Sequence, residues 1–209
     1  MIKAVIFDVD GVLIDSTIAN TKFYHNLFDF FGYQIPNDSD LQSMFNLSMM
    51  DIIRTISKLS DENEIQRIWE YGKDHKNEIY PLDLLTYPVN IDRVIEKLSK
   101  KYILGIVTSR VRGGIYMIPE LAKLKQYFKN EIYFEDTVKH KPDPEPLILS
   151  ATRLNVLSEE AVYIGDMESD AQAAKSAGMK IIIYSKNNLS GADGLTSDFT
   201  QLPRLIENI

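Results

Sequence analysis

Residues 4–13 constrain the fold more than any other stretch of the sequence. An apolar run ends at Phe7 and is followed by aspartates on alternate positions, Asp8 and Asp10, and then by Gly11. A continuous apolar run of this length is typical of a buried parallel strand. Residues two apart on an extended chain project to the same side, so the two carboxylates should point the same way, and Gly11 permits a sharp turn after them. We therefore expect Asp8 at the carboxyl end of a strand, where open α/β sheets bind ligands.

The composition excludes several classes of function. The 209 residues include 23 Lys and Arg against 30 Asp and Glu, and the resulting net charge of −7 disfavours nucleic acid or an anionic membrane as a partner. The absence of cysteine excludes disulfides, thiolate metal sites and a cysteine nucleophile. No apolar run approaches the length of a membrane span and the N-terminus shows no leader pattern, so we expect a cytoplasmic protein.

Two kinds of pattern divide the chain. In residues 16–80 apolar side chains recur at helical spacing, and Gly32 suits the position just after a helix. Residues 81–209 instead alternate apolar runs with helical patterns, which is typical of a parallel sheet covered by helices. We therefore predict an α/β fold, with a Rossmann-like parallel sheet flanked by helices in residues 1–15 and 81–209 and an all-helical subdomain inserted as residues 16–80. One continuous mixed domain is the alternative.

Local signals place the individual elements. Ser48 with Asp51 forms a possible capping box, and Ser60 and Asn90 could cap further helices. Pro119 is expected near the start of another helix. The remaining strands are expected over residues 102–107, 131–134, 161–164 and 180–184, and later helices over residues 144–154, 168–177 and 201–208.

Polar side chains follow the predicted strands at the point where each strand ends. Besides the two aspartates after the first strand, the sequence places in such positions Thr108, Ser109, Arg110, Lys141, Asp166 and Asp170. Because the carboxyl ends of parallel strands meet at one edge of a sheet, we expect these groups to lie close together. Carboxylates in a chain without cysteine favour magnesium, whose octahedral coordination would be completed by water and phosphate oxygens.

Each part of this set has an ordinary alternative. Thr108 could be a turn or helix cap, Lys141 a solvated loop charge, and the aspartates after the first strand a solvated turn. Asp166 and Asp170 could simply be acidic residues at a helix start. The histidines share no metal-ligand spacing and are interpreted as surface or capping residues: His25, His75 and His140. The conjunction of the motifs is far more specific than any one of them.

With these motifs taken together, the chain resembles the haloacid dehalogenase-like hydrolase superfamily, specifically the members with a helical cap inserted after the first motif. The four motifs occur in order as DVDGVLIDS (residues 8–16), IVTS (106–109), KPDPEP (141–146) and GDMESD (165–170). The match covers nearly the whole chain and is weakest in the cap, residues 16–80. The chain departs from the family where Pro88 is followed by valine rather than the frequent glycine, and where glycines and a proline interrupt residues 113–119.

The resemblance implies a role for each matching residue. Asp8 would be the nucleophile and a magnesium ligand, and Asp10 the general acid and base, with its backbone carbonyl on the metal. Asp166 would bind magnesium directly or through water, and Asp170 would support the site. The groups that hold the transferring phosphoryl group would be Thr108, Ser109 and Lys141.

The implied activity is that of a magnesium-dependent phosphatase, a phosphoric monoester hydrolase that forms an aspartyl-phosphate. Its substrate would be a small phosphorylated metabolite, such as a phosphoglycolate-like acid or a sugar phosphate. A sugar phosphomutase of the same architecture is the alternative. A dehalogenase is disfavoured because dehalogenases generally lack Asp10, and a non-catalytic phospho-acceptor is disfavoured by the Asp8-x-Asp10 motif and the helical insertion.

Overall fold

The computed structural model describes residues 1–45, 47–186 and 191–209. Contacts divide the chain into two compact units. The sheet unit comprises Met1–Asp15 and Tyr87–Ile209, and the helical unit comprises Ser16–Thr86. None of the helices in the described part of the chain combines the length and the apolar character needed to cross a membrane.

The sheet unit is built on a parallel six-stranded sheet with the strand order β3-β2-β1-β4-β5-β6. Phe7 is level with Ile106 on one side and with Ile164 on the other, so the first strand lies between two later ones. All four residues of that strand are buried, as its apolar run predicts. The strands are β1 (Ala4–Phe7), β2 (Ile103–Val107), β3 (Phe128–Ile132), β4 (Ala161–Gly165), β5 (Lys180–Tyr184) and β6 (Gly194–Thr196).

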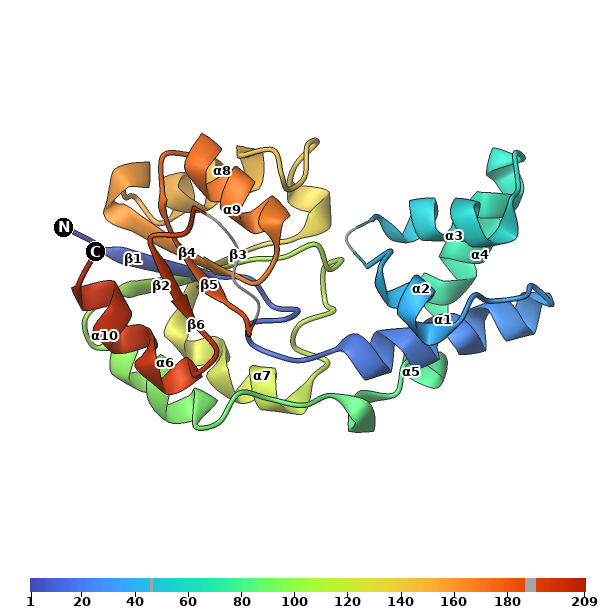
Figure 1. Cartoon of the computed structure of the whole chain (residues 1–209), viewed down its shortest axis with the longest axis horizontal. Coiled ribbons are helices and arrows are strands. Elements are labelled where there is room, and N and C mark those ends of the chain that lie inside the picture. The colour runs from blue at the N-terminus through green and yellow to red at the C-terminus, as the bar shows by residue number, and fades with distance from the viewer. Residues whose placement is uncertain (46, 187–190) are drawn as a thin grey trace. The chain divides into compact units, whose positions relative to one another are not determined.

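Helices cover both faces of this sheet (Figure 1). On one face α8 packs on β2 and β3, and α9 packs on β4 and β5. The opposite face carries α6, α7 and α10 (Figure 1). The bounds are α6 (Ile91–Ser99), α7 (Pro119–Leu124), α8 (Glu145–Arg153), α9 (Glu168–Ser176) and α10 (Leu202–Glu207). The predicted class, a parallel α/β sheet flanked by helices, is therefore confirmed.

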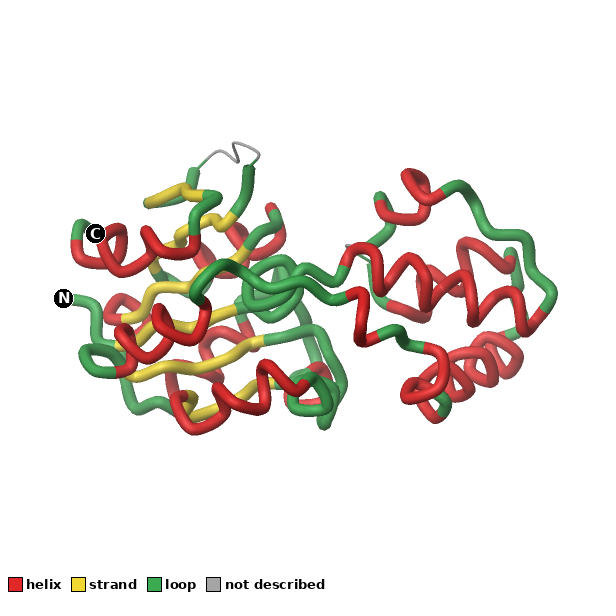
Figure 2. The backbone as a smooth tube through the Cα atoms, turned by 90° about the horizontal axis from the view of Figure 1, so that it is seen from below, coloured by secondary structure: helices red, strands yellow, loops and turns green. Residues whose placement is uncertain are grey.

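The helical unit contains helices and loops and no strand within residues 16–45 and 47–86 (Figure 2). Its helices are α1 (Thr17–Phe31), α2 (Asp38–Gln42), α3 (Met49–Ser57), α4 (Glu62–Asp74) and α5 (Lys76–Ile79), followed by a 3-10 turn at Leu82–Leu84. Gly32 ends α1 in the left-handed conformation, at φ 73°, as its position predicts. The fully buried side chains of this unit include Leu27, Phe28, Ile53, Ile65 and Ile68.

Several local predictions need correction. Ser48 caps α3 as expected, but the N-cap of α4 is Asp61 and not Ser60, because the Asp61 carboxylate accepts the Asn63 N–H at 3.0 Å. Asn90 precedes α6 with φ 57° and makes no side-chain capping bond. The strand expected over residues 131–134 begins three residues earlier, because Phe128 and Ile132 alternate inward and the chain then turns into a 3-10 segment. Helix α2 and strand β6 were not expected.

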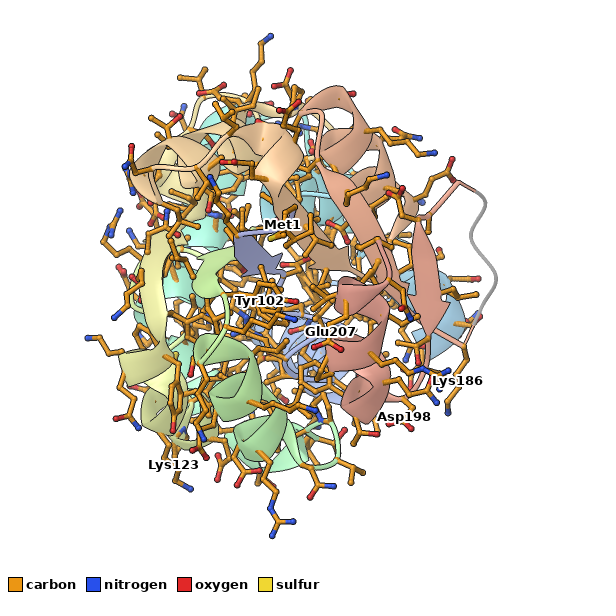
Figure 3. The ribbon with its side chains drawn as sticks, turned by 90° about the vertical axis from the view of Figure 1, so that its left-hand side faces the viewer. Met1, Tyr102, Lys123, Lys186, Asp198 and Glu207 are labelled. Atoms are coloured by element: carbon orange, nitrogen blue, oxygen red, sulfur yellow. The ribbon has the colours of Figure 1, made fainter. Side chains whose placement is uncertain are left out.

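The edge of the sheet unit where the strands begin carries ordinary surface charge. Figure 3 looks at the side of the sheet unit where Met1, Tyr102 and Glu207 lie, next to the starts of β1 and β2. Lys101 pairs with Glu207 at 3.0 Å, and Lys3 pairs with Glu160 at 2.5 Å, with both lysine side chains more than half exposed. The buried charges described next lie where the strands end.

Candidate active site

The carboxyl ends of β1, β2 and β4 bring the sequence motifs to one edge of the sheet. Asp8 follows β1 directly, and its N–H donates to the Ile164 carbonyl at 2.9 Å. Thr108 follows β2, and Asp166 follows β4. Because the three strands are parallel neighbours, their terminal side chains share this edge.

Three carboxylates lie together there. Asp8, Asp166 and Asp170 each offer an oxygen atom within 4.8 Å of the others. The Asp8 and Asp170 residues are 7% and 1% exposed. The Asp170 Oδ2 atom accepts the backbone N–H groups of Asp166 and Met167 at 3.1 and 3.0 Å, which fixes the loop that leads into α9.

The loop at Gly11 permits this close approach. Gly11 has φ +77°, a conformation that side chains with a Cβ rarely adopt, and a Cβ at this position would lie 2.0 Å from the Asp166 Oδ2 atom. A side chain at this position would therefore have to push the Asp166 carboxylate away from the loop of the first motif.

A buried lysine forms the centre of the cluster. The Lys141 ammonium lies 2.6 Å from Asp8 Oδ2 and 2.8 Å from Asp170 Oδ1, and it donates to the Tyr163 hydroxyl at 3.0 Å. An ammonium has three N–H donors, so these three partners use all of them. Lys141 can contact a substrate oxygen only by exchanging one of these partners.

Burial and mutual repulsion shift the acid–base behaviour of this cluster. Burial raises the pKa of Asp8 to about 7, against the opposing charge of Lys141. Burial also raises the pKa of Asp166 to about 8, and the charges of Asp8 and Asp170 add to this effect. For Lys141, burial acts to lower the pKa, but the Asp170 and Asp8 carboxylates outweigh it and hold the pKa well above its ordinary value.

Asp10 belongs to a second ion pair at the same edge. Arg110 donates from Nε and Nη2 to the two carboxylate oxygens of Asp10, each at 2.7 Å. The guanidinium side chain is 8% exposed and the Asp10 side chain 35% exposed. The structure thus places Asp10 beside the carboxylate cluster, with its charge paired by an arginine.

The groups predicted to hold a phosphoryl group lie around a small pocket. It has a volume of about 10 Å³, room for about one water molecule, and Thr108, Ser109, His140 and Lys141 are among the residues that line it. Thr108 is buried, and its Oγ1 accepts the Arg110 N–H at 3.1 Å. His140 stacks on Phe134 with ring centroids 3.9 Å apart, so it lies in the wall of the pocket and not simply on the surface.

Two residues of this site received no functional role from the sequence. Arg110 follows the second motif directly, and its closeness to Thr108 was the available signal. Tyr163 stands in an otherwise aliphatic strand, and a buried tyrosine normally has a partner for its hydroxyl. Neither signal identifies a partner until the fold shows that Arg110 lies opposite Asp10 and Tyr163 lies opposite Lys141.

The donor set fits a divalent cation. One ammonium pairs with two of the three carboxylates, Asp8 and Asp170, and Asp166 lies beside them, so negative groups are in excess in a buried place. Oxygen donors without thiolate or imidazole are the ligands that magnesium prefers. Asp8, Asp166 and Asp170 supply carboxylate oxygens here, whereas the Asp10 carboxylate faces Arg110.

The sequence motifs and this arrangement define a hydrolase class. The haloacid dehalogenase-like hydrolase family model matches residues 5–184, and the chain belongs to that family. Among curated relatives, the pyrophosphatase PpaX of Bacillus cereus (strain G9842) is 29% identical over 180 residues, which cover 86% of this chain and 81% of that protein.

Solved structures show the same fold. The β-phosphoglucomutase of Clostridium difficile has a TM-score of 0.81 at 22% identity and covers all of this chain and 96% of its own. A HAD-superfamily hydrolase of Geobacter sulfurreducens has a TM-score of 0.75 at 22% identity, covering 98% of this chain and 96% of its own. At these identities the likeness concerns the fold.

Proposed function

We propose that this chain is a magnesium-dependent phosphatase for small phosphorylated molecules that reacts through an aspartyl-phosphate. The observation that carries the proposal is the buried set at the strand ends, where Asp8 contacts Lys141 and lies within reach of Asp166 and Asp170. Phosphate-ester hydrolysis is among the slowest uncatalysed reactions, so positioned charges of this kind are what a catalyst requires.

In the proposed reaction Asp8 is the nucleophile. Its carboxylate oxygen attacks phosphorus, and the bond from phosphorus to the leaving oxygen breaks. Asp10 gives a proton to that leaving oxygen and later takes one from the water that hydrolyses the aspartyl-phosphate. Thr108, Ser109 and Lys141 hold the phosphoryl oxygens, with Lys141 exchanging its contact to Asp8 for one to the substrate.

The residues that would hold magnesium are Asp8 and Asp166 through their carboxylates and Asp10 through its backbone carbonyl, with Asp170 supporting the loop. When bound, the cation neutralises phosphoryl oxygens that would otherwise repel the Asp8 carboxylate. Without it, one ammonium faces three carboxylates, and an anionic substrate would meet net repulsion.

The substrate is proposed from two sources. The resemblance to the family suggests a phosphoglycolate-like acid or a sugar phosphate, and the relative from Bacillus cereus is named a pyrophosphatase. A sugar phosphomutase is the second candidate, because a β-phosphoglucomutase shares the fold. The cytoplasmic location, the lack of nucleic-acid and membrane partners, and the role of residues 16–80 as a cap stay predictions.

The test is a panel of phosphorylated molecules that includes pyrophosphate, phosphoglycolate and sugar phosphates. Phosphate release should require magnesium, stop with a chelator, and be accompanied by a transient phosphoryl adduct on Asp8 in quenched samples. A mutase would instead convert one sugar phosphate into its isomer without releasing phosphate. Full activity after exhaustive chelation, or an adduct on another residue, would contradict the proposal.

A further inference from the structure

The guanidinium of Arg110 binds a carboxylate of the same chain, that of Asp10. Two of its nitrogens donate to the two oxygens of Asp10, both at 2.7 Å, in the bidentate geometry typical of arginine with an oxyanion. A carboxylate and a phosphate present this fork with a similar spacing of oxygens, and arginine binds both. The place that Asp10 occupies is therefore a ready anion-binding site.

Burial and hydrogen bonds hold Arg110 in place, so its pairing with Asp10 is not a chance surface contact. The Arg110 side chain is 8% exposed, and its Nη1 points toward the Gly114 carbonyl at 3.5 Å. Its backbone is fixed too, because the Arg110 N–H donates to Thr108 Oγ1 and its carbonyl accepts the Phe134 N–H at 3.0 Å. Asp10 is the more exposed partner at 35%, so it is the one with room to turn away.

This anion site adjoins the place proposed for the phosphoryl group. Thr108, which contacts the Arg110 backbone, lines the same small pocket as Lys141, and Lys141 contacts the nucleophile Asp8. Asp10 is close enough for its charge to act on both Asp8 and Asp166. A small substrate with its phosphoryl group at Asp8 would bring a neighbouring substituent near Arg110.

We propose that Arg110 binds a second anionic group of the substrate, a carboxylate or a second phosphate, which displaces Asp10 from the guanidinium. This inference rests on the proposed function and narrows its substrate class to phosphate compounds with a second oxyanion close to the reacting phosphorus. The exchange replaces one bidentate pair with another, so the arginine stays paired. The displaced Asp10 carboxylate is then free to face the leaving oxygen. A substrate without a second anion offers Arg110 no replacement partner, and it reacts more slowly because Asp10 stays engaged.

The kinetic test compares substrates with and without a second anion. Pyrophosphate carries a phosphate, phosphoglycolate carries a carboxylate, and p-nitrophenyl phosphate carries neither. R110Q should lower kcat/KM for the first two about 10- to 100-fold more than for the third, mainly through KM. R110K, which keeps the charge but loses the fork, should fall between. The larger loss between pyrophosphate and phosphoglycolate tells which oxyanion the site takes.

R112Q is the matched control, because Arg112 lies two residues away, pairs with Asp136 and is 60% exposed. It removes the same charge and should leave the ratio between substrates unchanged. Equal losses by R110Q on all three substrates would overturn the proposal and leave Arg110 as a structural partner of Asp10. If R110Q does not fold, the comparison of R110K with wild type decides in the same way.

A binding measurement separates this inference from the proposed function. Calorimetry with methylenediphosphonate, a pyrophosphate analogue whose P–C–P bridge is not hydrolysed, at a fixed magnesium concentration should show tighter binding to D10N than to wild type, by about 3- to 10-fold, because Asp10 no longer competes for Arg110. The gain should disappear in the D10N/R110Q double variant. A wild type without turnover of any substrate would contradict the proposed function, but the D10N gain would still support the anion site. No gain in D10N would overturn it.

Discussion

Ion pairs at the strand-end edge of the sheet unit are buried, whereas those on the surface of the helical unit are exposed to solvent. At the edge of the sheet unit the Lys141 side chain is 8% exposed and those of its partners Asp8 and Asp170 are 10% and 1% exposed. In the helical unit Arg54 pairs with Asp51 and Glu62, yet these three side chains are 41 to 66% exposed. Solvated pairs of the second kind add little to stability, whereas buried carboxylates oppose folding unless they are compensated. The comparison indicates that the strand-end charges are retained for chemistry.

The largest effect is expected from Asp8→Asn. It removes the proposed nucleophile while keeping the side-chain volume, so phosphate release should fall by about 10⁴-fold or more. Steady-state phosphate release, with circular dichroism to verify the fold, measures this. The matched control is Asp29→Asn, which removes the same charge from an exposed position of the helical unit and should leave the rate unchanged. Substantial turnover by a folded Asp8→Asn variant would mean that another residue is the nucleophile.

Asp10→Ala should produce a smaller loss that depends on the leaving group. A poor leaving group such as an aliphatic alcohol needs the proton, so its turnover should fall by about 10²- to 10⁴-fold. With p-nitrophenyl phosphate the first step needs little acid help, and a burst of nitrophenol with accumulated phosphoenzyme is expected. Rapid-quench measurements distinguish these cases. Equal losses on both substrates without a phosphoenzyme would point to a structural role for Asp10.

The stability of the metal-free protein should fall as the pH rises from about 4 to 8. The native pKa values of Asp8 and Asp166, about 7 and about 8, exceed the ordinary value of 3.8, so the native state binds more protons than the unfolded state in this range. This stabilisation is complete below the unfolded pKa, declines as the pH rises above it, and is lost once the pH passes the native pKa values.

Thermal melts at pH 5 and pH 8, with chelator and with magnesium, check this expectation. Magnesium should raise the melting temperature at pH 8 more than at pH 5, because the ionised carboxylates bind it. An Asp166→Asn variant should reduce the pH dependence, since it removes one of the two shifted groups. A melting temperature that increases steadily from pH 5 to pH 8 in chelator would contradict the raised pKa values of Asp8 and Asp166.

The smallest effect is expected from Arg54→Ala in the helical unit. Its partners are exposed and screened, so the melting temperature should change by less than about 2 °C. Ile53→Ala provides the contrast at the next position, because its side chain is fully buried and its truncation should cost about 2–5 kcal/mol. A large loss for Arg54→Ala would show that the helical unit depends on its surface charges after all.

The sequence predicted the elements whose signals are local. The apolar runs gave four strands closely, and Gly32 and Ser48 marked helix ends through their backbone preference and side-chain oxygen. Strand β6 has only three residues, and this is too short for a period of apolar side chains to reveal it. An edge position also explains why the start of β3 was misplaced.

The site residues divide in the same way: local sequence signals predict where they lie, but not which partner each one binds. Strand ends could be located from the sequence, so the grouping of Asp8, Thr108, Asp166 and Lys141 at one edge could be expected. The partner that each side chain selects could not, because that depends on the depth and direction of neighbouring loops. The pairing of Arg110 with Asp10 joins positions 100 residues apart. Similarly, the contact of Tyr163 with Lys141 depends on which face of β4 is turned toward the buried carboxylates.

The close approach at Gly11 has a consequence for how this chain tolerates change. A residue without any functional group is as restricted as the carboxylates, because even one added carbon would lie 2.0 Å from the Asp166 oxygen. In a library of all single substitutions, the profile at Gly11 should therefore match that of a reacting residue. The turn of the first motif is thus constrained at a position that contributes no chemical group of its own.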